Sequence, residues 1–170
     1  MKAKVARTEP DEGATRTARR APRDETNNRL FFRLFQCANL YETAALRELN
    51  ITGVQGATLG ALSRDVENGM SFSDLYAYLS VSRQNLDAVL KRLERLGYVE
   101  RCEGTHDRRT RIVRLTLAGA QAWKAQQNLN FEFYRQATAG VSVAEAIACA
   151  DTLAKIGRAL KAARLKLTDE

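Results

Sequence analysis

Apolar residues recur at helical spacing over most of the 170-residue chain, and residues 82–97 give the clearest case. Leucines and a valine fall there at i, i+3, i+4 and i+7, which places them on one face of a helix. Ser82 is a favourable N-cap and Gly97 a favourable C′ residue, so the pattern predicts a helix between them. The predicted buried stripe comprises Leu86, Val89, Leu90, Leu93 and Leu96.

A shorter helix is predicted just before this one. Ser71 and Asp74 have the spacing of a capping box, in which a hydroxyl at the N-cap and a carboxylate at N3 satisfy free backbone amides. The helix then covers residues 72–79, and Ser80 and Val81 make the turn to the next helix. This order of helix, short turn and helix indicates a helix-turn-helix.

A β-hairpin is predicted directly after the helix pair. Residues 98–102 and 110–115 interleave β-branched residues with arginines, and a turn containing Gly104 joins them. With this hairpin as its wing, the segment 52–116 is predicted to be a winged helix-turn-helix. The tip of the wing carries three arginines that can reach a narrow minor groove, namely Arg108, Arg109 and Arg111.

Four further helices are predicted, one of them within this lobe and three outside it or at its edge. They cover residues 27–50, 52–65, 116–136 and 142–166, and Ser142 with Glu145 makes a capping box for the last. The first and last helices have apolar faces too broad for one small core, so they are expected to bury them elsewhere. We therefore predict a mainly α fold in one domain, 25–170, with a small β-hairpin wing and a second helical lobe from 25–50 and 117–170. Residues 1–24 lack hydrophobic periodicity and are predicted to be a disordered basic tail.

The charge of the chain narrows the class of partner. The formal net charge is +7 and the pI about 9.6. Residues 82–114 alone hold nine Lys and Arg against five Asp and Glu, so the excess lies where a winged helix meets double-stranded DNA. On the predicted 82–97 helix, the face opposite the apolar stripe includes Asp87 and Arg95 as well as the predicted contacts. The predicted DNA contacts are Ser82, Arg83, Gln84, Asn85, Lys91, Arg92, Arg108, Arg109 and Arg111.

Four short motifs in this order resemble the MarR family of transcription regulators. They are Val81-Ser82-Arg83, residues 93–101 (LERLGYVER), Asp107-x-Arg109 and Leu115-Thr116-x-x-Gly119. The resemblance implies a homodimer that binds a palindromic operator, with Arg109 entering the minor groove and Asp107 orienting the wing. The chain departs from the family in carrying Asn85-Leu86-Asp87-Ala88 where a Thr-x-Thr-Arg-like segment is frequent.

The resemblance also implies regulation by a small molecule. In the family a ligand sits between the dimerisation lobe and the winged-helix lobe and lowers the affinity for DNA. We therefore expect a repressor that is released by a small aromatic acid or its CoA thioester. Arg29, Arg33, Phe35 and Tyr41 are the candidate ligand-binding residues, because the arginines can neutralise a carboxylate and the rings can stack. The alternative is that these aromatic residues form the dimer core.

Catalytic and cofactor chemistry has little support in this sequence. His106 is the only histidine and falls at the predicted wing tip, and the chain has neither a phosphate-binding glycine loop nor a Cys-x-x-Cys pair. We expect no enzyme activity, no metal and no cofactor. No 18-residue apolar run and no secretory signal are present, which favours a cytoplasmic protein without a membrane anchor.

Two other functions stay open at this point. The three cysteines, Cys37, Cys102 and Cys149, lie on different predicted elements and suit a reducing compartment. Cys37 falls on or beside the apolar face of its helix, where core packing is expected, and a thiol-based redox-sensing repressor is the first alternative. A ligand-independent architectural or RNA-binding protein is the second, and its affinity would come from phosphate contacts alone.

Overall fold

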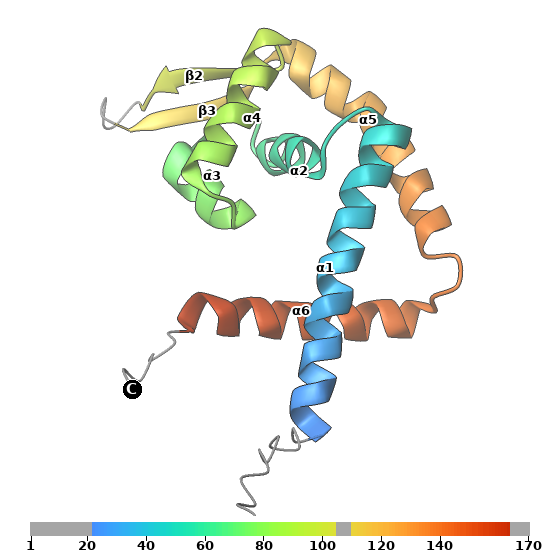
Figure 1. The fold of residues 1–170 in the computed structure, drawn as a ribbon. Coiled ribbons are helices and arrows are strands. Elements are labelled where there is room, and N and C mark those ends of the chain that lie inside the picture. The colour runs from blue at the N-terminus through green and yellow to red at the C-terminus, as the bar shows by residue number, and fades with distance from the viewer. Residues whose placement is uncertain (1–21, 105–109, 164–170) are drawn as a thin grey trace, which may run out of the picture. The chain divides into compact units, whose positions relative to one another are not determined.

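The computed structural model describes residues 22–104 and 110–163, and the chain divides into two compact units, residues 1–40 and 41–170. Wing-tip residues His106, Asp107, Arg108 and Arg109 lie outside the described ranges. The elements in chain order are α1 (Pro22–Leu49), α2 (Gly53–Leu62), β1 (Met70–Ser71), α3 (Phe72–Leu79), α4 (Arg83–Arg95), β2 (Val99–Glu103), β3 (Arg111–Leu115), α5 (Leu117–Ala137) and α6 (Val143–Ala162) (Figure 1).

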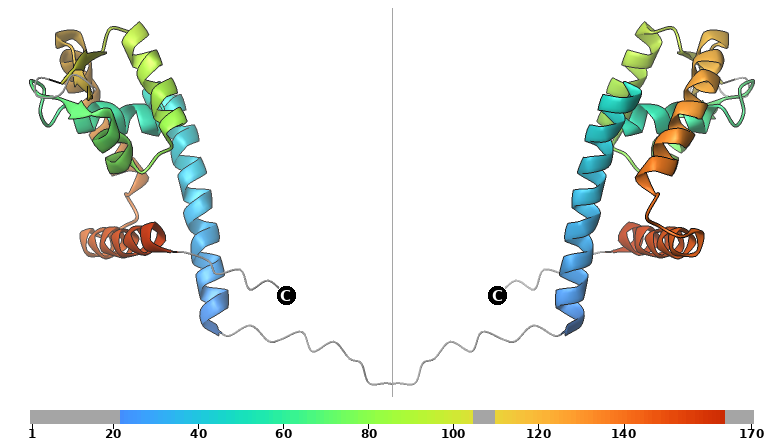
Figure 2. Two further views of the ribbon diagram at one scale, coloured as in Figure 1. Left: turned by 90° about the vertical axis from the view of Figure 1, so that its left-hand side faces the viewer. Right: turned by 90° about the vertical axis from the view of Figure 1, so that its right-hand side faces the viewer.

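Helix α1 is continuous and begins earlier than the sequence pattern predicts (Figure 2). Residues 22–24 were expected in the disordered tail, but they form its first turn. Proline is favoured at the first helical position because its missing N–H is not needed there. Asp24 and Glu25 also lie in the first turn, where negative charge interacts favourably with the helix dipole.

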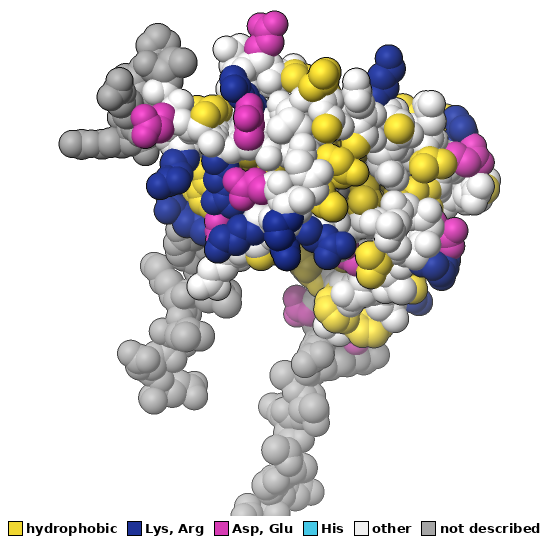
Figure 3. All heavy atoms as spheres, turned by 90° about the horizontal axis from the view of Figure 1, so that it is seen from above, with side chains coloured by type: hydrophobic (Ala, Val, Ile, Leu, Met, Phe, Trp, Pro, Cys, Tyr) yellow, Lys and Arg dark blue, Asp and Glu magenta, His cyan; other side chains and the backbone are white. Residues whose placement is uncertain are grey.

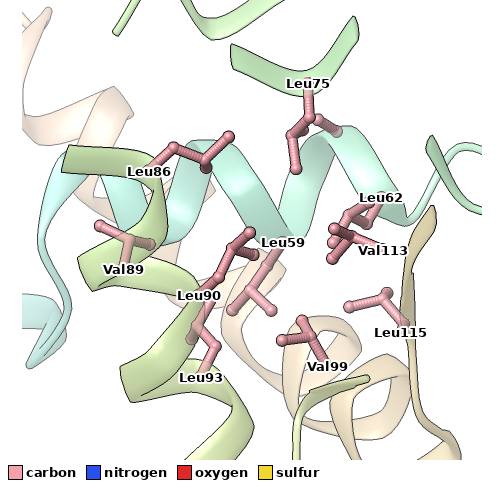
Figure 4. Packing of buried hydrophobic residues seen from close by; sticks show 11 residues of the cluster. Leu59, Leu62, Leu75, Leu86, Val89, Leu90, Leu93, Val99, Val113 and Leu115 are labelled. Carbon is pink, nitrogen blue, oxygen red and sulfur yellow. The ribbon is translucent and has the colours of Figure 1, made fainter. Parts of the chain in front are cut away.

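The core of the second unit lies between α2, α3, α4 and the sheet (Figure 4). Leu62, Leu75, Leu86, Leu90 and Val113 are all at most 1% exposed. Four of the five residues of the predicted stripe on α4 are buried. The exception is Leu96, which is 52% exposed because the helix ends at Arg95 and Leu96 serves as its C-cap.

A three-stranded antiparallel sheet in the order β1-β3-β2 replaces the two-stranded hairpin that was predicted. The register pairs Val99 with Leu115 in the wing and Met70 with Val113 at the extra strand. Gly69 leads into β1 with φ +67, and a Cβ placed there would lie 2.3 Å from the Val113 carbonyl oxygen, so the approach of the two chains requires glycine. The sequence pattern missed β1 because two residues are too few to show an alternation.

Five helices begin at a hydroxyl cap, as was predicted for Ser71, Ser82 and Ser142. Thr52, Ser71, Ser82, Thr116 and Ser142 each accept a hydrogen bond from a backbone amide in the first turn of their helices. The boundaries differ in detail, since α2 ends at Leu62 rather than at residue 65 and the wing strands are shifted by about one residue. The turn between α3 and α4 begins at Ser80, whose φ of 56 is left-handed.

Large apolar side chains remain exposed on α6 and on the first part of α1. Helix α6 has no buried residue, and Val143 and Ile147 are 77% and 59% exposed. In the first unit, Phe32 and Phe35 are 57% and 64% exposed. Both faces therefore still lack a packing partner within their own units. None of the helices in ranges 22–104 and 110–163 is long and apolar enough to cross a membrane.

Candidate nucleic-acid interface

The exposed surface of α4 is the centre of the candidate site. Ser82 caps the helix, because its Oγ accepts a hydrogen bond from the Asn85 amide over 3.2 Å. Arg83, Gln84 and Asn85 in the first turn are exposed, as the predicted role in reading bases requires. The opposite face of the same helix is buried, so the core fixes which side chains face outward.

Arg83 is held by an aromatic residue of the preceding helix. Its guanidinium carbon lies 4.8 Å from the centroid of the Tyr76 ring, and its Nη2 donates a hydrogen bond to Tyr76 Oη over 3.2 Å. Tyr76 in turn packs on the core and contacts Phe72, with ring centroids 6.2 Å apart. A cation over an aromatic ring is attracted by the negative face of the ring. Arg83 is thus oriented before any ligand binds.

Asp87 does not simply face outward, as the helical period predicted. Its Oδ1 accepts a hydrogen bond from Arg101 Nη1 over 2.8 Å, and its Oδ2 pairs with Lys91 Nζ at 2.9 Å. Hydrogen bonds from Lys91 and Arg101 hold the pKa of the Asp87 carboxyl below its ordinary value. Arg101 also places Nε 3.0 Å from Glu94 Oε1. A strand arginine that the sequence reasoning did not single out therefore joins two carboxylates of α4.

One signal in the sequence points to Arg101. Alternation along β2 puts residues 99 and 101 on the same face, and Val99 is buried. An arginine at an inward-facing strand position needs an acidic partner nearby, since a buried charge is costly without one. Asp87 and Glu94 on α4 are those partners.

The second half of α4 is basic and exposed. Lys91, Arg92 and Arg95 lie there, and Arg95 Nε bonds to the Lys91 carbonyl oxygen over 3.3 Å. Space-filling spheres show Lys and Arg side chains gathered along one side of the molecule (Figure 3). Because Lys91 is paired with Asp87, Arg92 and Arg95 are the better candidates for phosphate contacts in this half.

The structure describes the wing up to Gly104 and again from Thr110. The Gly104 amide donates a hydrogen bond to the Thr110 carbonyl oxygen over 2.8 Å and closes the described part of the hairpin. Arg111 is exposed at the start of β3, opposite Glu103. The predicted contacts of Arg108 and Arg109, and the orienting role of Asp107, stay predictions because those residues lie outside the described ranges.

The base of the wing is fastened to the start of α5. The Thr116 amide bonds to the Tyr98 carbonyl oxygen over 3.1 Å, and Thr116 Oγ1 donates to the Gly97 carbonyl oxygen over 2.5 Å. The same Oγ1 accepts from the Gly119 amide over 3.0 Å. A Cβ at position 119 would lie 1.9 Å from the Tyr98 carbonyl oxygen, which explains the glycine.

The predicted ligand-binding residues fall in different units. Arg29, Arg33 and Phe35 are exposed in the first unit, where Arg33 Nη1 donates to Gln36 Oε1 over 3.1 Å. Tyr41 belongs to the second unit and contacts Phe133, with ring centroids 6.3 Å apart. Burial raises the pKa of the Tyr41 hydroxyl, and its hydrogen bond with Tyr134 raises it further.

Two cavities of the second unit adjoin α4. One has a volume of about 420 Å³ and the other about 590 Å³. Gln55 of α2 and Arg92 of α4 line both, whereas none of the four predicted ligand-binding residues lines either. The smaller cavity has mainly apolar walls from α2, α4 and α5, and Arg92 is its charged lining residue. Its lining also includes Leu49, Leu59, Leu93, Tyr98, Ala122 and Gln126.

The cysteines are not core residues of this chain. Cys37 and Cys149 are exposed, and Cys102 is half-buried with Sγ 3.9 Å from the Ile112 carbonyl oxygen. The expectation of core packing for Cys37 is therefore wrong for the single chain, because the apolar face of this part of α1 is itself exposed. Within the part of the chain that the structure describes, no three His, Cys, Asp or Glu residues come together to hold a metal.

Comparison with known sequences agrees with this arrangement. Residues 49–110 match the model of the MarR family. The transcriptional activatory protein BadR of Rhodopseudomonas palustris is 48% identical over 104 residues, which cover 59% of this chain and 59% of BadR. The chain thus matches less than two thirds of the length of this relative.

Solved structures share the fold over most of the chain. A probable transcriptional regulator from Pseudomonas aeruginosa has a TM-score of 0.69 at 23% identity and covers 77% of this chain and 98% of its own. A mutant MarR from E. coli complexed with operator DNA has a TM-score of 0.65 at 24% identity, over 79% of this chain and 95% of its own. The MepR–DNA complex of S. aureus has a TM-score of 0.63 at 23% identity, over 78% of this chain and 96% of its own.

The helix-turn-helix, the sheet beside it and the helices around them define a winged helix-turn-helix protein. The segment that matches the MarR family model contains three of the four motifs on which the resemblance to this family rests. This family and the relatives found here are transcription regulators and not enzymes.

Proposed function

We propose that this protein is a transcription regulator that binds double-stranded DNA as a homodimer. The observation that carries the proposal is α4, which buries one face in the core and presents Arg83, Gln84 and Asn85 at its capped start. Polar side chains at the start of such a helix reach base edges in the major groove, and basic ones farther along reach phosphates. The DNA-bound structures of similar fold support this use of the helix.

A second copy of the chain would supply the missing packing partners. Exposed apolar side chains on α6 and on the first part of α1 include Val143, Ile147, Phe32 and Phe35. Contiguous exposed apolar surface marks an interaction site. A two-fold dimer then presents two α4 helices to half-sites about 34 Å apart, so its operator is palindromic.

The direction of regulation has two candidates. The resemblance to the family favours repression. The 48% identical relative is named an activatory protein, which favours activation. A reporter gene under the bound promoter separates them, because deletion of the regulator raises expression in the first case and lowers it in the second.

The cavity of about 420 Å³ supports regulation by a small aromatic acid or the acyl part of its CoA thioester. Its volume is in the range of small-molecule sites, and apolar walls with one arginine and three side-chain amides suit a ring with a carboxylate. Arg92 lines this cavity and also belongs to α4, so a bound anion competes for a side chain that DNA requires. Arg29, Arg33, Phe35 and Tyr41, the residues expected from the sequence, are the alternative candidates for ligand binding.

DNA binding is tested by selecting bound duplexes from a random pool with the full chain. We expect a palindromic site occupied by two chains. Sequence-independent binding, with equal affinity for RNA, would instead support the architectural alternative. Titration of the complex with benzoates, hydroxycinnamates and their CoA thioesters should release DNA by a factor of about 5 to 150 and raise the melting temperature of the free protein.

Three variants then identify the responsive site. Ala122→Leu fills the cavity and should abolish the response to the acid while DNA binding persists. Arg29→Ala combined with Arg33→Ala should leave the response intact, and the opposite pattern would move the ligand to α1. If no compound acts, release of DNA by thiol oxidation that Cys37→Ser abolishes would establish the redox alternative.

A further inference from the structure

We propose that Arg101 is a positioning residue for DNA binding. Building on the proposed function, Arg101 fixes α4 to strand β2 of the wing and neutralises carboxylates on α4 that would otherwise repel the phosphates of DNA. The role differs from that of the predicted contact residues, because Arg101 acts through Asp87 and Glu94 and touches no nucleotide itself.

The contacts of Arg101 tie the strand to two residues that lie about two turns apart on the helix. Nη1 lies 2.8 Å from Asp87 Oδ1, Nη2 lies 3.5 Å from the Asp87 carbonyl oxygen, and Nε lies 3.0 Å from Glu94 Oε1. One planar guanidinium thus contacts groups seven residues apart on α4. A lysine ammonium is a point charge on a flexible stem and lacks this fork.

The charges in this cluster cancel. Asp87 and Glu94 contribute two negative charges, and Arg101 and Lys91 contribute two positive ones. Loss of Arg101 leaves one uncompensated negative charge on the helix that faces DNA. Asp87 lies between the first-turn residues Arg83 to Asn85 and the basic residue Arg92, so the added charge falls within the proposed contact surface.

Burial argues against a direct phosphate contact by Arg101. Its side chain is 20% exposed, and its Nε is buried against Glu94. Arg114 on the neighbouring strand provides the comparison. It is 43% exposed and pairs with Glu100, its cross-strand neighbour on β2. Arg114 is therefore a matched control with the same side chain and the same type of partner.

The test compares operator affinity and its salt dependence for wild type, Arg101→Gln, Arg101→Lys, Asp87→Asn and the double variant Asp87→Asn/Arg101→Gln, with Arg114→Gln as the control. We expect Arg101→Gln to weaken binding about tenfold, Arg101→Lys to weaken it less, and the double variant to recover to within about threefold of Asp87→Asn. The slope of affinity against salt should stay unchanged in Arg101→Gln, whereas loss of a phosphate contact would reduce it by about one unit. Arg114→Gln should stay within about twofold of wild type.

Two results would overturn the positioning role. One is a loss of affinity in Arg101→Gln that Asp87→Asn does not rescue and that lowers the salt slope. The other is additivity of the two substitutions in the free energy of unfolding, measured by urea titration of the same proteins without DNA. The unfolding cycle needs no DNA, so it tests the coupling between Arg101 and Asp87 even if wild type binds no duplex. Failure of wild type to bind any duplex would contradict the proposed function and not this coupling.

Discussion

The guanidinium of Arg83 and the ring of Tyr76 form a preformed unit at the start of α4, with 4.8 Å between the guanidinium carbon and the ring centroid. The hydroxyl of the same tyrosine accepts a hydrogen bond from Arg83 Nη2. Tyr76 belongs to α3 and packs on the core. It therefore holds Arg83 of the next helix, α4, in a fixed position. This arrangement reduces the rotamer entropy that Arg83 loses when it binds a ligand.

Replacement of Tyr76 therefore weakens DNA binding without removing a contact to DNA. We expect Tyr76→Leu to lower operator affinity about two- to fivefold, since an exposed cation–π contact contributes about 0.5–1 kcal/mol. Tyr76→Phe keeps the ring and should lose less. Fluorescence anisotropy with a labelled duplex measures both. Tyr78→Phe is the control, because Tyr78 lies on the same helix as Tyr76 and its hydroxyl accepts a hydrogen bond from Arg64 instead of Arg83; an equal loss there would argue against a specific role of Tyr76.

Within α4 the structure separates two kinds of substitution. Gln84→Ala should change which bases are preferred, because its side chain is exposed in the first turn. Arg92→Ala should weaken all sequences alike and reduce the salt slope by about one unit. Lys91→Ala should have a smaller effect than Arg92→Ala, since Lys91 Nζ is already paired with Asp87. Binding to a library of operator variants at several salt concentrations measures all three, and equal slopes for Lys91 and Arg92 would refute this ranking.

The wing prediction rests on the Asp107-x-Arg109 motif. Arg109→Ala should weaken operator binding by about 1 to 3 kcal/mol, as expected for the loss of one groove contact. The melting temperature should not change, because the sequence pattern predicts Arg109 at the wing tip and away from the apolar core. Unchanged affinity at moderate salt would remove Arg109 from the interface.

The ion pairs of Asp87 with Lys91 and Arg101 predict a defined pH dependence of the free energy of unfolding. The folded state lowers the pKa of Asp87 below its ordinary value of 3.8, so the unfolded chain binds its proton first as pH falls. The contribution of Asp87 is therefore complete above the ordinary value and is lost as pH falls through the lowered pKa of the folded state. Urea titrations of wild type and Asp87→Asn between pH 6 and pH 2 should give a difference in unfolding free energy that shrinks only at the acid end. A difference independent of pH would contradict the ion pairs.

Local signals predicted the DNA-binding part of the fold. Ser82, Thr116 and Ser142 are recognisable as caps because a hydroxyl just before an apolar repeat satisfies free amides. The stripe of α4 predicted four buried residues correctly because burial follows the helical period. It failed at Leu96, where the helix had already ended.

Features that depend on contacts between segments far apart in the sequence could not be predicted from such local signals. Strand β1 has two residues and exists because β3 pairs with it. The pairing of Arg101 with Asp87 depends on the position of β2 beside α4, which no local spacing encodes. The cavity lined by Gln55, Arg92 and Gln126 is assembled from residues of α1, α2, α4 and α5, which are far apart in the sequence.

The hydrogen bonds that join Thr116 to Gly97 and Tyr98 make the wing a lever arm of α5. Five-residue strands extend about 17 Å at about 3.3 Å per residue, so a tilt of about 10° at the start of α5 displaces the far end by about 3 Å. A minor groove is only about 6 Å wide. A rotation of this size at the start of α5 would therefore shift the far end of the wing by about half the width of that groove.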